Sequence, residues 1–218
     1  MRRAYLTGAD LLTNPCGGAV APCDYSRMGN VMSLSRLWSC CLVVWLCLLW
    51  HEPASAASST HVYLVRGVFN VSVGLDELAA KFIKRGVPAT VYGPMSPGSV
   101  ASDAIADYRS GKIRNIVLIG HSLGGGTVFS VAESLKDEKI PVALMIVLDA
   151  SGGPAPANVR RVINYYVGGG TVTAGPGFHG SLQNIDVSKI PGMGHMAIQS
   201  MSSMHQKMIG NVGAAGGG

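Results

Sequence analysis

The sequence predicts an α/β fold in which helices flank a mostly parallel sheet of five or six strands. Short apolar runs alternate with segments whose apolar residues recur at helical spacing, which is the order of repeated βα units. The runs at 116–119 and 142–148 are apolar at every position, as is typical of strands buried on both faces of a parallel sheet. Glycine or proline follows several of these segments and marks where they end.

The first two strand–helix units are predicted from residues 61–109. Residues 61–66 form the first expected strand. A helix is expected over 75–85, because its apolar residues fall on one face and a glycine and a proline follow as stop signals. Residues 89–92 form the second expected strand, and 100–109 form a helix with apolar residues at i, i+3, i+4 and i+7.

The second half continues the alternation with strands at 116–119, 142–148 and 162–167. An amphipathic helix is expected around 128–135, and another over 196–208. The apolar residues of the last helix are Ile198, Met201, Met204 and Met208. Their helical spacing favours packing in the core over a role in a hydrophobic acyl-binding site.

The N-terminal part contains the three parts of a secretory signal peptide. Arg36 provides a basic start, residues 37–50 carry no charge, and Ala54-Ser55-Ala56 matches a small-x-small cleavage site. The uncharged run is shorter than the roughly 20 apolar residues of a membrane span. We therefore expect a signal peptide over 32–56 and export, to the periplasm or the medium, of a protein without a stable membrane span; if uncleaved, the segment would be an anchor.

Two terminal segments are expected to lie outside the folded domain, which we predict over 57–209. Residues 1–31 precede Met32 and show no periodicity, so we expect either an artefact of the assigned start or an unstructured segment. Residues 210–218 are rich in glycine and are expected to be a disordered tail.

The composition excludes several classes of function. The chain is 48% hydrophobic and 13% charged, which excludes a disordered protein, and its net charge of +5 is scattered without the clustered basic patch of a nucleic-acid-binding protein. All cysteines precede the predicted cleavage site, so the exported domain has no disulfide, no thiolate metal site and no cysteine nucleophile. The sequence shows no metal constellation, and we expect no metal and no cofactor. The oligomeric state cannot be read from it.

Ser122 is the candidate nucleophile. Gly120-His121-Ser122-Leu123-Gly124 fits the pattern G-x-S-x-G, with a predicted strand before it and a predicted helix after it. A serine attacks esters only when a histidine takes its proton, a carboxylate orients that histidine and donors receive the oxyanion. The alternative interpretation is a glycine-rich turn without catalytic chemistry.

The acid and the base are sought in the loops that follow the strands, because functional groups lie at the carboxyl ends of a parallel sheet. These loops are 67–73, 94–98, 120–126, 149–158 and 175–197. Asp149 directly follows a buried strand and is the candidate acid, with Asp186 as its rival. His195 lies in a glycine-flanked loop and completes the chain order Ser, Asp, His, which makes it the candidate base.

The other histidines are weaker candidates for the base. His179 lies in a plausible loop without further support, His61 starts a strand at the wrong end, and His205 lies within a helix. His121 is next to Ser122 and is expected to be a packing residue.

From His61 to about His205 the chain resembles a small α/β-hydrolase of the lipase or esterase kind. The resemblance is carried by Gly-His-Ser-Leu-Gly-Gly from Gly120, by Asp149 and by His195. Residues 156–166 also resemble poorly characterised exported bacterial hydrolases. The resemblance implies that Ser122 attacks, that His195 acts first as general base and then as general acid, and that Asp149 orients it.

The resemblance also implies an oxyanion hole made by two backbone N–H groups. Leu123 would supply one and Val68 the other, with Phe69 as the rival, because the His-Gly-Gly-Gly loop of some lipases is absent. No long lid insertion is visible. We thus expect a serine hydrolase that cleaves small-molecule or lipid carboxylic esters through an acyl-serine; a thioesterase, an acyltransferase and a non-catalytic binding protein remain open.

Overall fold

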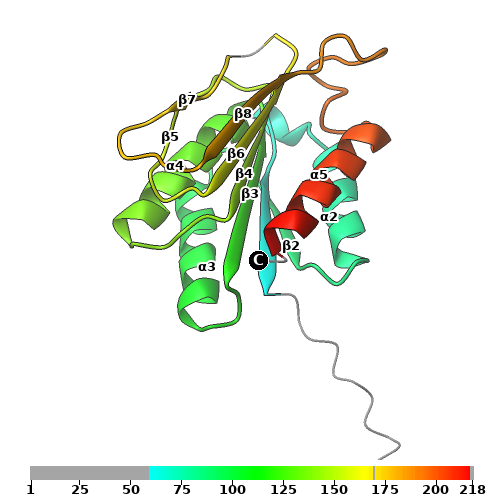
Figure 1. Cartoon of the computed structure of the whole chain (residues 1–218). Coiled ribbons are helices and arrows are strands. Elements are labelled where there is room, and N and C mark those ends of the chain that lie inside the picture. The colour runs from blue at the N-terminus through cyan, green and yellow to red at the C-terminus, as the bar shows by residue number, and fades with distance from the viewer. Residues whose placement is uncertain (1–58, 169, 217–218) are drawn as a thin grey trace, which may run out of the picture. The chain divides into compact units, whose positions relative to one another are not determined.

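A computed structural model of the chain describes residues 59–168 and 170–216 (Figure 1). The expected upstream segment 1–31 and the expected signal peptide 32–56 lie outside these described residues. Among the helices that the structure describes, none is both long and apolar enough to cross a membrane.

Six parallel strands form the main sheet, in the order β2-β1-β3-β4-β6-β8, which confirms the predicted mostly parallel sheet. The strands are β1 (Thr60–Val65), β2 (Ala89–Tyr92), β3 (Asn115–His121), β4 (Leu144–Leu148), β6 (Arg161–Tyr166) and β8 (Ser181–Asp186). Two further strands of two residues each, β5 (Pro154–Ala155) and β7 (Thr173–Ala174), pair with each other in a small separate sheet.

The strand order reverses at β1. After β1 the chain adds β2 on one side, and it then returns to place β3 on the other side of β1. The loops that follow β1 and β3 therefore leave neighbouring strands at a topological switch point. In open α/β sheets, this crevice outside the carboxyl ends of the strands is where ligands bind.

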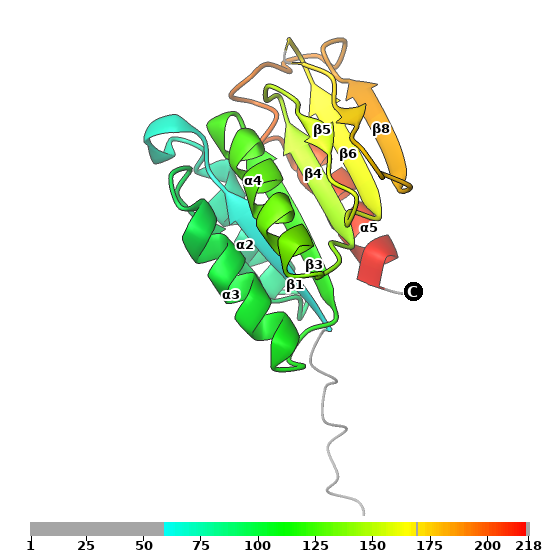
Figure 2. The ribbon, with the colours of Figure 1, turned by 90° about the vertical axis from the view of Figure 1, so that its left-hand side faces the viewer.

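Helices cover both faces of the sheet. Figures 1 and 2 show α3 (Pro97–Arg109) and α4 (Leu123–Asp137) on one face, and α2 (Gly74–Ile83) and α5 (Ser202–Gly216) on the other. Each pair of helices buries its apolar stripe in one of two core clusters that the sheet separates. At about 1.5–3 kcal/mol for each large apolar side chain removed from water, these two clusters are the main favourable contribution to the stability of the fold.

The central strands are buried on both faces, as their unbroken apolar sequences predicted. In β3, Ile116 and Leu118 belong to the cluster beneath α3 and α4, whereas Val117 and Ile119 belong to the cluster beneath α2 and α5. Every residue of β3 and of β4 is buried. A strand with two apolar faces fits only between two layers of helices, which accounts for the observed sandwich.

The strand β8 was not predicted, and it lies within the region 175–197 that was expected to be a loop. This strand reads Ser-Leu-Gln-Asn-Ile-Asp, occupies the edge of the sheet and is largely exposed. Its two apolar residues pack on opposite faces, Leu182 against one core cluster and Ile185 against the other. One apolar residue on each face is too few to produce a recognisable strand pattern.

The C-terminal prediction was wrong in two respects. The helix expected over 196–208 is α5, which begins only at Ser202, and the tail expected to be disordered over 210–218 is helical as far as Gly216. Val212 is 2% exposed and packs in the same core cluster as Met204 and Met208, at helical spacing. This packing stabilises a helix that its glycines alone would disfavour. It also confirms that Met204 and Met208 are core residues, whereas Met201, which precedes the helix, is partly buried against the same cluster.

Candidate active site

Ser122 stands on a sharp turn between β3 and α4. Its backbone angles are φ 55° and ψ −122°, in a region that residues with a side chain rarely occupy. Two glycines permit this turn. A Cβ atom on Gly120 would lie 2.3 Å from the carbonyl oxygen of Gly124, and a Cβ on Gly124 would lie 2.3 Å from that of Val65. The close approach of α4 to β1 thus presents the serine at the carboxyl edge of the sheet.

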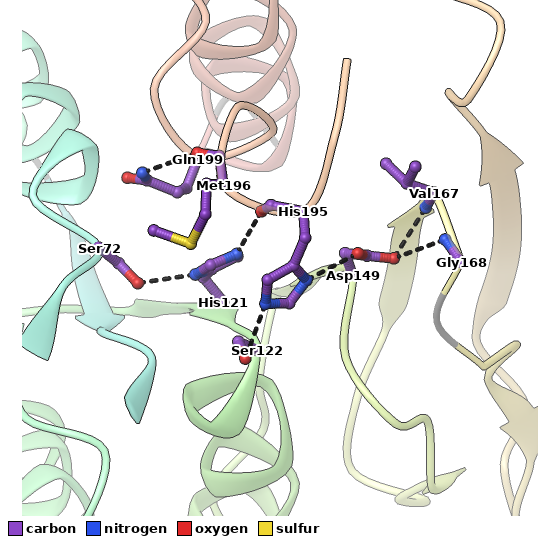
Figure 3. Close-up of polar contacts among 9 residues, drawn as sticks. All are labelled: Ser72, His121, Ser122, Asp149, Val167, Gly168, His195, Met196 and Gln199. Carbon is purple, nitrogen blue, oxygen red and sulfur yellow. Dashed lines mark hydrogen bonds and ion pairs between the residues drawn. The ribbon is translucent and has the colours of Figure 1, made fainter. Parts of the chain in front are cut away.

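The structure brings together Ser122, Asp149 and His195, which the sequence analysis singled out. Nε2 of His195 lies 3.1 Å from Oγ of Ser122, and Nδ1 of His195 lies 2.8 Å from Oδ2 of Asp149 (Figure 3). A carboxylate only accepts hydrogen bonds, so Nδ1 carries the proton. In the neutral imidazole, Nε2 is then free to accept the proton of the serine hydroxyl.

Asp149 is buried directly after β4, with 7% of its surface exposed. Its other carboxylate oxygen, Oδ1, accepts hydrogen bonds from the backbone N–H groups of Val167 at 2.8 Å and Gly168 at 3.0 Å (Figure 3). Burial of a carboxylate requires such donors. Because two backbone amides hold one oxygen, the other is fixed in its position toward His195.

A cavity of about 530 Å³ adjoins the three side chains. It is lined by Ser122, Leu123, Gly126, Asp149, Ala150, Ser151, Gly168 and His195. Five of these eight residues are Gly, Ala or Ser, so most side chains in the lining are small. A substrate group can therefore approach Ser122 from this side. In the described part of the chain, no group of three His, Cys, Asp or Glu side chains could hold a metal ion.

The two backbone amides proposed for the oxyanion hole lie on segments that meet at Ser122. Leu123 is the first residue of α4, and the first N–H groups of a helix have no partner within it. Val68 begins a short 3₁₀ turn, η1 (Val68–Asn70), immediately after Gly67. A Cβ atom on Gly67 would lie 3.2 Å from Cβ of Ser122, so the backbone before Val68 lies against the serine. The N–H of Gly67 itself is bound to Oγ of Ser72.

His121, expected to be a packing residue, also makes two polar contacts. It is buried, and its Nδ1 lies 2.6 Å from Oγ of Ser72, while its Nε2 lies 2.8 Å from the carbonyl oxygen of His195. Burial lowers the pKa of His121 below its ordinary value. The motif pointed to His121 by position alone, and no sequence signal linked it to Ser72, which lies 49 residues earlier.

The rival candidates take part in other contacts. Asp186 ends β8, where hydrogen bonds from Ser188 lower the pKa of its carboxyl group. His179 is exposed in its loop. His61 lies at the opposite edge of the sheet and is bonded to Thr90, and His205 is bonded to Lys81 and to the carbonyl oxygen of Gln199.

No family model matches the sequence, and no curated protein matches it. The structure is similar to the RedJ thioesterase of the prodiginine biosynthetic pathway of Streptomyces coelicolor, with a TM-score of 0.50 and 10% identity over 80% of this chain and 95% of that chain. It is also similar to the NocB thioesterase domain of the nocardicin cluster, with a TM-score of 0.50 and 12% identity over 72% of this chain and 95% of that chain. At these identities the likeness concerns the fold alone, and it agrees with the α/β-hydrolase-type sandwich expected from the sequence.

Proposed function

We propose that this protein is a serine hydrolase that cleaves carboxylic esters through an acyl-serine intermediate. The observation that supports the proposal most strongly is the position of the His195 imidazole, whose two nitrogens lie within hydrogen-bond distance of Ser122 and Asp149. A nucleophile, a base and an orienting acid in this order are the arrangement that activates a serine hydroxyl.

In the proposed reaction, Oγ of Ser122 attacks the ester carbonyl carbon while Nε2 of His195 takes the hydroxyl proton. Asp149 stabilises the imidazolium that forms, and the N–H groups of Leu123 and Val68 receive the developing oxyanion. The tetrahedral intermediate then collapses. The bond to the alkoxy group breaks, and the proton on Nε2 passes to the departing oxygen. A water molecule repeats the sequence on the acyl-serine, releasing the carboxylic acid and restoring Ser122.

Exposed apolar side chains around the site support a substrate with a hydrophobic acyl group. The described residues include eight large hydrophobic side chains that are exposed, and seven of them follow the ends of strands or adjoin His195. We call these seven the apolar rim: Val68, Phe69, Val71, Val73, Met95, Leu123 and Met196. Asn70 approaches Gly93, and Oγ1 of Thr127 in α4 donates to the carbonyl oxygen of Pro94, so the loops that carry the rim lie beside one another.

Phe69 is the most exposed member of the apolar rim. Its side chain is 88% exposed, and its backbone φ of 54° is strained for a residue that is not glycine. Covering a phenylalanine side chain gains about 1.5–3 kcal/mol. An acyl chain laid across the rim would provide that cover, which is how a hydrophobic ester would gain affinity at this site.

A thioester is the second candidate substrate. Two proteins to which the structure is similar, RedJ and the NocB domain, are thioesterases. The same three side chains would cleave either bond, because only the leaving atom differs. An acyltransferase would differ only in the acceptor that attacks the acyl-serine.

The first experiment is fluorophosphonate labelling of the purified 57–218 protein, read by intact mass and peptide mapping. Stoichiometric modification of Ser122, absent in Ser122→Ala, is the expected result. A folded protein that stays unmodified would refute the hydrolase proposal. Matched oxygen esters and thioesters with the same acyl chains, from acetyl to dodecanoyl, then identify the leaving atom, and added alcohols or amines reveal acyl transfer.

We further propose that the protein is exported and cleaved near Ala56, from the signal-peptide pattern of residues 32–56. N-terminal sequencing of the protein recovered from outside the cytoplasm tests this. A product that begins after Ala56 is expected, and a product that retains residues before Met32 would contradict it. Recovery with the membrane fraction would indicate an uncleaved anchor.

A further inference from the structure

A chain of buried hydrogen bonds links the loop after β1 to the loop that carries His195. The backbone N–H of Gly67 donates to Oγ of Ser72 at 2.8 Å, and Oγ of Ser72 lies 2.6 Å from Nδ1 of His121. Nε2 of His121 then lies 2.8 Å from the backbone carbonyl oxygen of His195 (Figure 3). Ser72 is 0% exposed and His121 1% exposed, so neither side chain can touch a substrate.

The directions of these bonds follow from the chemistry of the groups. A carbonyl oxygen only accepts, so Nε2 of His121 carries a proton and donates it to His195. In a neutral imidazole Nδ1 is then an acceptor, and the hydroxyl of Ser72 donates to it. That leaves a lone pair on Oγ of Ser72 for the N–H of Gly67. Every donor along the chain therefore meets one acceptor.

We propose that His121 and Ser72 are positioning residues, which hold the loop of His195 and the loop of Val68 in register with Ser122. The inference rests on the proposed function, because it assigns the two side chains a task in assembling that site. Ser72 fixes the turn at Gly67 and so directs the next amide, that of Val68. His121 fixes the backbone from which the imidazole of His195 projects. Because His121 directly precedes Ser122 in the chain, its bonds hold both loops in position relative to the nucleophile.

The loop of His195 needs such an anchor. Gly192 and Gly194 precede His195 and a series of turns follows it, and the side chain of His195 is 48% exposed. The link to Asp149 holds only the imidazole. The N–H groups of Ala197 and Ile198 bond to the carbonyl oxygen of Gly194, but these bonds stay within the loop and do not tie it to the strand of Ser122. We therefore expect that loss of the bond from His121 lets the backbone rotate and carries the imidazole away from Ser122. A misplacement of about 1 Å is enough to cost roughly 10²-fold in rate.

Two substitutions of His121 separate its two bonds. His121→Gln places an amide N–H near the position of Nε2 and keeps a donor for the carbonyl of His195. His121→Asn keeps an acceptor near the position of Nδ1, for Ser72, and loses the donor. Ser72→Ala removes the hydroxyl and leaves the N–H of Gly67 without its partner.

His61→Gln is the matched control. His61 is also buried and also bonded to a hydroxyl, that of Thr90 at 2.9 Å, and its Nδ1 lies 3.2 Å from Oδ2 of Asp107. It lies near the amino ends of the strands, opposite Ser122. This variant measures the cost of losing the polar contacts of a buried histidine without disturbing the site.

The experiment measures the rate of fluorophosphonate labelling of Ser122, together with kcat and KM for a short soluble ester, and the melting temperature of each variant. His121→Asn is expected to lower kcat by about 10²-fold with little change in KM, and His121→Gln to recover about tenfold of that loss. Ser72→Ala is expected to lower kcat by about tenfold. His61→Gln is expected to match the wild-type rate despite a lower melting temperature.

Equal rates for His121→Asn and His121→Gln, or rates of folded variants within about twofold of wild type, would overturn the proposal. If the wild-type protein is not labelled, the hydrolase proposal fails by itself. The positioning proposal is then decided by ¹⁵N NMR of the histidine rings. The expected result is His121 with its proton on Nε2, and a shift of the His195 ring signals in His121→Asn but not in His61→Gln. A proton on Nδ1 of His121 would refute the proposal.

Discussion

The two carboxylate oxygens of Asp149 accept hydrogen bonds from different groups: one from His195, and the other from two backbone amides. Oδ2 lies 2.8 Å from Nδ1 of His195, and Oδ1 accepts the N–H groups of Val167 and Gly168. The carboxylate therefore cannot turn, and its two oxygens are not equivalent. This asymmetry determines what an amide in the same place would do.

Asp149→Asn should fold normally and be almost inactive. The amide oxygen of the asparagine is the only atom that can accept from Val167 and Gly168, so its NH₂ group must face His195. Nδ1 of His195 would then become an acceptor, and the proton would move to Nε2, which could no longer take the proton of Ser122. We expect kcat to fall by about 10⁴-fold with an unchanged melting temperature. An ester assay beside thermal denaturation measures both, and activity within tenfold of wild type would contradict the reasoning.

Ser122→Gly should make the protein more stable while it abolishes activity. The positive φ of Ser122 is a conformation that glycine adopts without strain. We expect Ser122→Gly to be about 1–2 kcal/mol more stable than Ser122→Ala, which removes the same hydroxyl but keeps the strained Cβ. Urea denaturation compares the two free energies of unfolding. Equal values would mean that the turn is not strained.

Gly124→Ala should destabilise the protein strongly. The new methyl group would lie 2.3 Å from the carbonyl oxygen of Val65 and 2.4 Å from that of Arg66, so α4 would have to move away from β1. We expect a loss of about 2–3 kcal/mol in the free energy of unfolding. Gly126→Ala is the control within the same helix, because nothing lies within 4 Å of the added methyl. It should be neutral or stabilising by up to about 1 kcal/mol.

Stability should fall in mildly acidic solution, in part through His121. Burial lowers the pKa of His121 in the folded protein, and the imidazole of His195 and the carboxylate of Asp149 are its titratable neighbours. In the unfolded chain this histidine takes up a proton with a pKa of about 6.5. Its contribution is therefore complete above about pH 6.5 and is lost as the pH falls through the lower pKa of the folded state.

The measurement is the free energy of unfolding at about pH 7.5 and about pH 5, in wild type and in His121→Gln. The variant should lose less stability between the two values than wild type does. Burial also lowers the pKa of His61, so part of the pH dependence will remain in the variant. An identical loss in both proteins would show that His121 does not titrate differently on folding.

Phe69→Ser should reduce activity toward long acyl chains only. The side chain is almost fully exposed, so its loss removes little packing, but it takes the largest apolar group from the rim. We expect kcat/KM for a dodecanoyl ester to fall by about tenfold and that for an acetyl ester to change little. Ile83→Ser is the control, because Ile83 is exposed on α2 and is not part of the rim. Equal effects of the two substitutions would contradict a role for the rim.

The sequence predicted those parts of the fold that depend on local pattern. Buried strands such as 116–119 and 142–148 were predicted from an unbroken apolar run, and helices such as 100–109 from the spacing of their apolar residues. The strand β8 could not be found in this way, since it is held by pairing with β6 and needs few apolar residues. The length of α5 was not predicted either. Its glycines disfavour a helix, and the burial of Val212 that stabilises its last turns is visible only in the structure.

The residues of the candidate site also differ in whether a local sequence signal marks them. Ser122, Asp149 and His195 are marked by a motif, by the end of a strand and by chain order, and the structure brings them together; their catalytic role stays a prediction. Nothing in the sequence marks Ser72 or its contact with His121, which only the structure reveals. A contact between residues far apart in the chain leaves no trace in one sequence, because each side chain taken alone is an ordinary polar residue.

The polar composition of β8 also bears on how the protein behaves at high concentration. The outermost strand of a sheet offers free peptide groups to any other extended chain, and the strand from Ser181 to Asp186 offers them beside mostly exposed polar side chains. A second molecule that added a strand there would have to strip water from the exposed side chains of Gln183 and Asp186, with little apolar surface gained in return. The polar sequence of β8, which kept this strand from being predicted, thus also disfavours edge-to-edge association of molecules into aggregates.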